Sequence, residues 1–150
     1  KLISYKRNVI TMKLQAKLLG YAGLIPFLLL NMALLFDAYP TSLIYILFTQ
    51  YSAVLLSFFG GIHWYDAISS NKNGHQMYIA MLPTIIGWLC LTQTGAHWVL
   101  GVLSASYVLM MFYDKQVLTL PKTMVVDYTK LRMTLTTIVV LSHAVMIFSR

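Results

Sequence analysis

The sequence has 150 residues, of which 59% are hydrophobic and only 10% are charged, with 11 lysines and arginines against 4 acidic residues. A soluble domain carries about 25% charged residues, and so few charges cannot cover a water-exposed surface of this size. With Cys90 as its single cysteine, the chain is also neither a disulfide-bonded secreted domain nor a disordered one. The composition predicts an integral membrane protein.

Five apolar stretches follow one another along the chain, and a membrane-spanning helix needs roughly 20 such residues. We expect helices at 18–36, 42–67, 77–91, 97–113 and 131–148, the third extended at its outer end by Thr92 and Gln93. Pro26 and Pro83 each remove a backbone donor and predict bends in the first and third helices. The predicted fold is an all-α bundle of five transmembrane helices in residues 18–150.

Residues 1–17 precede the first span and contain five basic and no acidic residues. This pattern predicts a basic amphipathic segment on the membrane surface, and it is also typical of the remains of a mitochondrial targeting segment. The chain begins at Lys1 rather than Met, which leaves removal of a presequence and a shortened sequence as explanations. No small-residue cleavage site follows the first span, so we expect it to be retained.

The basic residues fall on one side of a five-span topology. Ten lie in the N-terminal arm, the second loop and the fourth loop: Lys1, Lys6, Arg7, Lys13, Lys17, Lys72, Lys115, Lys122, Lys130 and Arg132. Only Arg150 lies on the other side. Because basic loops stay inside, the N-terminus is predicted inside and the C-terminus outside.

The net charge of +7 is explained by this asymmetry. The charges flank apolar spans and no nucleic-acid motif accompanies them. We therefore expect the basic residues to contact anionic phospholipid head groups, and we expect no nucleic-acid partner.

Small residues recur every four positions in two spans. Ala53, Ser57 and Gly61, with Gly60 beside them, lie in the second span, and Gly101 and Ala105 lie in the fourth. Small residues allow helices to approach closely inside lipid. These faces are predicted to form helix crossings.

Few titratable side chains lie within the spans. His63 and Asp66 are one turn apart near the inner end of the second span. An imidazole beside a carboxylate suits a proton relay or a quinone contact, and it equally suits a boundary pair that stabilises the helix end. We expect His63 and Trp64 to make a contact at the inner interface.

Other chemistry has little support in the sequence. His97 and His143 fall in the outer half of the fourth and fifth spans, where a pair of histidines can hold a b-type haem, but each is alone on its helix. No metal-ligand spacing and no nucleophile motif is present, and all four aspartates fall at predicted span edges or in loops. We expect no metal, no cofactor and no enzymatic activity.

Four runs carry a family resemblance: LGYAGLIPFLLL at 19–30, YSAVLLSFFGGIHW at 51–64, MLPTIIGW at 81–88 and DYTKLRMTLT at 127–136. In this order they resemble a family of small membrane proteins, a domain of unknown function that includes transmembrane protein 69 of animals and bacterial relatives. The chain departs from the family at Tyr65, where members often have Gly, and at Asp127, where they commonly have Trp. The resemblance implies a five-helix protein of a bacterial or mitochondrial inner membrane, and it supplies no activity.

Two functions compete on these observations. A small chain that is nearly all membrane, with small-residue faces and no catalytic set, favours an accessory subunit or assembly factor of a larger inner-membrane complex, such as a respiratory complex. The alternative is a small transporter or a proton- or quinone-linked protein that uses His63 and Asp66. The mitochondrial inner membrane is slightly favoured over the bacterial one.

Overall fold

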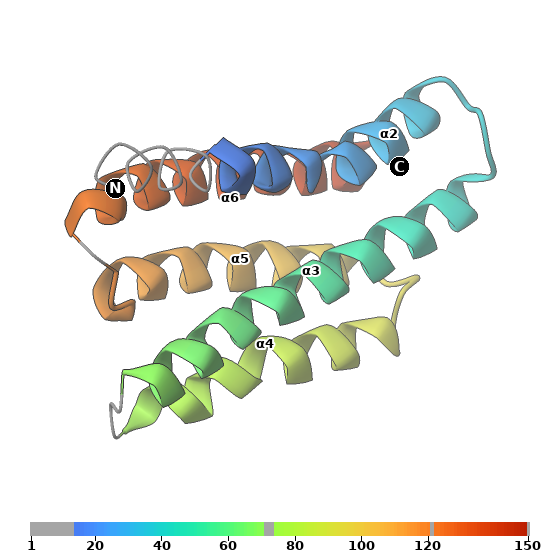
Figure 1. Cartoon of the computed structure of the whole chain (residues 1–150). Coiled ribbons are helices and arrows are strands. Elements are labelled where there is room, and N and C mark those ends of the chain that lie inside the picture. The colour runs from blue at the N-terminus through green and yellow to red at the C-terminus, as the bar shows by residue number, and fades with distance from the viewer. Residues whose placement is uncertain (1–13, 71–73, 121, 150) are drawn as a thin grey trace.

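The computed structural model describes residues 14–70, 74–120 and 122–149 (Figure 1). The described chain is all-helical, as predicted. The N-terminal helix Leu14–Leu35 includes α2 (Ile25–Leu35), and α3 (Thr41–Ser69), α4 (His75–Leu91), α5 (His97–Val117) and α6 (Lys122–Phe148) follow. Nearly all of the predicted segment 1–17, together with Lys72 and Arg150, lies outside the described residues.

Successive helices run in opposite directions (Figure 1). The Leu14 end of the bundle is where the described chain begins, α3 and α5 end, and α4 and α6 begin. Phe148 lies at the opposite end, called here the Phe148 end. Three exposed lysines, Lys17, Lys115 and Lys130, lie near the Leu14 end.

The outer surface of the bundle is apolar. Large side chains such as Leu19, Phe58 and Tyr78 are exposed by 73%, 62% and 80%, which water would not tolerate at this density but lipid favours. Leu14–Leu35, Thr41–Ser69 and Met124–Phe148 are long and apolar enough to cross a membrane, and His75–Leu91 is a shorter apolar helix. The chain is thus a multi-pass membrane protein.

Two helices extend further than the apolar stretches predicted. α5 continues to Val117 and α6 begins at Lys122, so the connection between them is short and Lys115, Lys130 and Arg132 lie in helices. Backbone hydrogen bonding does not depend on side-chain polarity, so helices continue past the apolar residues that mark the membrane core.

The first helix is interrupted at Gly23 and Leu24, just before Pro26. Proline cannot donate a backbone hydrogen bond, and the Tyr51 hydroxyl donates to the Gly23 carbonyl oxygen at 2.7 Å. The interruption lies next to the position where Pro26 predicted a bend. α4, in contrast, continues through the buried Pro83.

The closest crossing joins α3 and α4. A β-carbon at Gly60 would overlap the carbonyl oxygen of Ala80, and one at Gly87 would lie 2.9 Å from the carbonyl oxygen of Ala53. Ser57 also faces this crossing, 3.3 Å from the position of a Gly87 β-carbon. The predicted contribution of Ala53, Ser57 and Gly60 to helix packing is confirmed.

Gly61, Gly101 and Ala105 do not form the predicted helix crossings within the described bundle, since all three are exposed and the two glycines have open space around the position of a β-carbon. A step of four residues advances the direction of a side chain by about 40° in a helix of 3.6 residues per turn. Two steps carry Gly61 about 80° away from Ala53, whereas Gly60, seven residues on, returns to within about 20°.

Gly60→Ala is therefore expected to destabilise the bundle by about 1–3 kcal/mol, because the added methyl group forces α3 and α4 apart. Gly61→Ala is the matched control and should leave stability unchanged or slightly higher. Thermal unfolding of the detergent-solubilised variants measures both effects. Equal unfolding temperatures for the two variants would contradict the assigned crossing.

Candidate functional site

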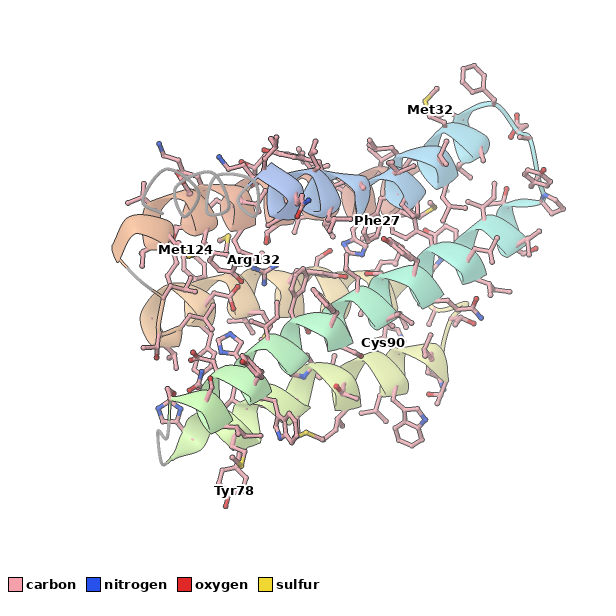
Figure 2. All side chains as sticks on the ribbon, viewed as in Figure 1. Phe27, Met32, Tyr78, Cys90, Met124 and Arg132 are labelled. Atoms are coloured by element: carbon pink, nitrogen blue, oxygen red, sulfur yellow. The ribbon has the colours of Figure 1, made fainter. Side chains whose placement is uncertain are left out.

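Four polar side chains, one from each of α3 to α6, are buried together near the Leu14 end. His63, Gln76, Asp114 and Arg132 are exposed by 0%, 3%, 6% and 3%, and Figure 2 shows Arg132 pointing from α6 into the bundle. We call these four residues the Asp114 cluster. Ionisable groups are rare in the interior of a membrane bundle and mark functional sites by default.

Asp114 is the centre of the cluster because both of its carboxylate oxygens are occupied. Oδ1 lies 2.5 Å from Nε2 of His63, and Oδ2 accepts a hydrogen bond from Nε of Arg132. A buried carboxylate is tolerated only when its charge is compensated and its lone pairs are satisfied. Arg132 supplies the compensating charge, and His63 supplies a further hydrogen bond.

Gln76 connects the cluster to Asp66. Its Nε2 donates to Oδ2 of Asp66 at 2.8 Å and lies 3.3 Å from Nδ1 of His63. An amide nitrogen carries two hydrogens, so it can donate to both. Nδ1 of His63 is then an acceptor, which leaves the proton of a neutral imidazole on Nε2, where it is donated to Asp114.

Aromatic rings enclose the charged groups. The guanidinium carbon of Arg132 lies 3.6 Å from the ring centroid of Phe59, a cation–π geometry that is favourable in a desolvated site. The Tyr113 ring centroid is 4.9 Å from that of His63, and the Tyr113 hydroxyl lies 2.8 Å from Nδ1 of His75. His63 is thus packed against an aromatic ring and lies within hydrogen-bond distance of Gln76.

The structure changes the partner predicted for His63. Asp66 is near, but it is joined to His63 through Gln76, and the direct carboxylate partner is Asp114. Asp114 lies in the last turn of α5, as expected for a span edge, but its side chain is buried inside the bundle. Trp64, next to His63, is exposed on the outer surface.

Arg132 was expected among the basic residues at the membrane boundary, and instead it is buried against Asp114. One sequence signal could have located it. Residues 132, 136, 139, 143 and 146 follow the spacing of one helical face, and all five are buried. No comparable signal pairs Asp114 with His63, because this contact joins residues 51 positions apart.

A second set of buried polar contacts lies nearer the Phe148 end. Nε2 of His143 is 2.7 Å from Oγ of Ser52, and the Tyr107 hydroxyl donates to the Ser52 carbonyl oxygen at 2.6 Å. His143 is fully buried among aromatic rings, whereas His97 is exposed at the start of α5. The two histidines considered for a haem thus differ in environment. In the described ranges, no three His, Cys or acidic residues converge as a metal site.

Removing one partner of the Asp114–Arg132 pair should be far more harmful than removing both. Asp114→Leu leaves Arg132 as an uncompensated buried charge and is expected to destabilise the bundle by about 3–5 kcal/mol. The double variant Asp114→Leu/Arg132→Met should recover most of that loss. Lys115→Met, at the exposed neighbouring position, is the control, and thermal unfolding in detergent is the measurement. A single variant as stable as Lys115→Met would contradict the assigned pairing.

One protein family accounts for almost the entire chain. Its model, described as a protein of unknown function (DUF3429), matches residues 12–148. No curated protein and no solved structure matches the chain. The resemblance to a family of unknown function is thereby confirmed, while the likeness to transmembrane protein 69 stays a prediction. The match covers both partners of every contact in the Asp114 cluster, and the chain belongs to the DUF3429 family.

Proposed function

We propose that this protein is a small proton-linked membrane protein, in which the Asp114 cluster takes up and releases a proton as a membrane-soluble molecule binds beside it. The observation that carries the proposal is the fully buried His63, hydrogen-bonded at 2.5 Å to a carboxylate that is already paired with Arg132. Histidine is the side chain whose charge changes most readily near neutral pH. The sequence-based alternative placed proton-linked chemistry on His63 and Asp66. The proposal keeps that chemistry and makes Asp114 the direct partner of His63.

The amide of Gln76 supplies a reason for coupled proton movement. A protonated His63 has a donor at Nδ1 and needs an acceptor there, which Gln76 offers only if its amide turns to present Oε1. In that orientation Oε1 would also face the Asp66 carboxylate, so Asp66 must move or accept a proton. Protonation of His63 is therefore linked to Asp66, whose Oδ2 also accepts from the backbone nitrogen of Thr119 at 3.4 Å.

A purely structural lock is the competing interpretation of the cluster. Asp114 and Arg132 compensate each other's charge, and a lock would need only a hydrogen-bond donor on the second carboxylate oxygen, which does not have to be an imidazole. In the proposed function the imidazole gains or loses the proton, and the bridging amide changes its orientation. This distinction is measurable.

His63 is expected to be the Nε2–H tautomer, because Gln76 donates to Nδ1 and Asp114 accepts from Nε2, and to change protonation state when a membrane-soluble molecule binds beside the cluster. Nitrogen NMR of histidine-labelled protein in lipid nanodiscs measures both properties, and single His→Gln variants at 75, 97 and 143 assign the signals. In Gln76→Leu the donor to Nδ1 is lost, but the Nε2–H tautomer should persist because Asp114 still accepts from Nε2. An imidazole that keeps one tautomer and one protonation state throughout would support the lock and remove the proposed function.

The remaining sequence-based hypotheses are also proposals. We infer an inner membrane, with the mitochondrial one favoured, and an N-terminus inside, supported by Lys17, Lys115 and Lys130 near the Leu14 end, where they would face anionic head groups. We also propose the likeness to transmembrane protein 69, which implies the same localisation.

An accessory or assembly role in a larger complex, such as a respiratory complex, is the second candidate function. The observation that favours it is the position of Gly61, Gly101 and Ala105, which leave the lipid-facing surface with small residues where a neighbouring helix can approach.

This accessory role predicts that the protein migrates with larger subunits on a native gel of mildly solubilised membranes, and mass spectrometry of the band identifies them. Gly101→Leu should weaken the association without affecting the fold, because the position is open in the isolated bundle. Migration as a monomer or small oligomer would exclude the accessory role and leave the proton-linked function.

A further inference from the structure

A cavity of about 360 Å³ lies beside the Asp114 cluster, between the N-terminal helix, α3 and α6. Its wall is almost entirely apolar, with Leu24, Leu55, Leu135 and Val139 among the lining residues. This volume lies in the range of small-molecule sites, which are apolar pockets with a few polar groups. Arg132 lines the same cavity and belongs to the cluster.

The polar groups of this cavity form one stripe along α6. Tyr128, Arg132 and Thr136 all line the cavity and follow one another at four-residue intervals, which places them on one helical face about 6 Å apart. The Tyr128 hydroxyl, both Nη atoms of Arg132 and Oγ1 of Thr136 are buried and have no hydrogen-bond partner among the residues that the structure describes. Arg132 and Thr136 are each only 3% exposed.

Unpaired donors of this kind are costly in an apolar interior. Nε of Arg132 is already used by Asp114, so the two Nη groups are the donors left for another acceptor. A ligand oxygen beside Arg132 and Tyr128 would satisfy these groups. Because Asp114 neutralises the guanidinium charge, a neutral oxygen fits better than an anion, which would add an uncompensated buried charge.

The cavity is reached from the outer surface of the bundle. Leu19 and Phe58 line it and are exposed by 73% and 62%. In a bundle surrounded by lipid this surface faces the membrane, so an occupant arrives from the membrane. Its body must be apolar to match the wall.

We propose that this cavity binds a neutral, carbonyl-bearing amphiphile from the membrane, with its carbonyl oxygen accepting hydrogen bonds from Arg132 and Tyr128 and its apolar body between the N-terminal helix, α3 and α6. Two kinds of molecule carry such a carbonyl, a lipid-soluble quinone and an acyl ester. The ligand site names the molecule that the proposed function requires, and it rests on that function only for the link between Arg132 and His63. Occupancy of the cavity is measured independently of proton exchange.

The test uses a photoreactive decylubiquinone with a diazirine on its tail, added to the full chain in lipid nanodiscs. Mass spectrometry should locate saturable labelling on cavity residues such as Leu55 and Leu135. Unlabelled decylubiquinone, methyl decanoate, decanoic acid and decylbenzene compete in separate arms. Competition by the quinone or the ester supports the proposal and identifies the source of the carbonyl. Stronger competition by decanoic acid would overturn the neutral assignment, and equal competition by decylbenzene would overturn the role of the polar stripe.

Variants separate the hydrogen bond from the volume of the cavity. Tyr128→Phe removes one hydrogen-bond donor and should raise the ligand concentration at half-saturation roughly fivefold to tenfold. Leu135→Trp fills the cavity and should abolish saturable labelling. An unchanged thermal unfolding temperature shows that the variant still folds. Tyr78→Phe is the matched control, since Tyr78 points away from the bundle on α4 (Figure 2). Labelling that is unaffected by Leu135→Trp, or that maps outside the cavity, would overturn the site.

His63→Gln separates this inference from the proposed function. Labelling should persist in this variant, because His63 does not line the cavity. Saturable cavity labelling together with a His63 that keeps one protonation state would retain the ligand site and reject the proton link. A His63 that changes protonation state in a protein without cavity labelling would retain the proton link and reject the ligand site.

Discussion

Compensation of one buried carboxylate organises the Leu14 end of this bundle. Asp114 accepts from Arg132 of α6 and contacts His63 of α3, while Gln76 of α4 reaches the same imidazole. Four helices are therefore joined by directional contacts in a region where apolar side chains alone would not select one arrangement, since lipid competes equally for apolar surface. Because the buried carboxylate of Asp114 must keep its compensating partners, it fixes how α3, α4, α5 and α6 face one another.

Close helix contact supplies the second constraint. α3 and α4 approach so closely at Gly60 and Gly87 that their backbones meet, and this holds Gln76 near His63. The N-terminal helix packs differently. It is interrupted before Pro26, and it leaves a cavity against α3 and α6 rather than filling that space. The bundle thus combines a tightly packed pair with a loosely packed helix, and Arg132 lies between the two regions.

The 3.6-residue period of the helix explains which sequence-based predictions of helix packing succeeded and which failed. Periodicity identified Ala53, Ser57 and Gly60 as a close-packed face, and it failed at Gly61 because repeated steps of four drift around the helix. The break near Pro26 followed from a missing backbone donor, which is a local property. The sequence-based prediction put Arg132 at the membrane boundary, because a search for apolar stretches treats an arginine near a span as a boundary residue. In the structure α6 begins ten residues before Arg132, at Lys122.

The sequence by itself determined the class of protein and the order of the helices that the structure describes, because these depend on composition and on spacing within one segment. Only the tertiary structure decided that Asp114 pairs with His63 and Arg132, and that the unpaired donors of α6 face a cavity. Periodicity specifies which residues share a face of one helix, but it does not specify which faces of different helices meet. That choice depends on the packing and charge compensation of the whole bundle.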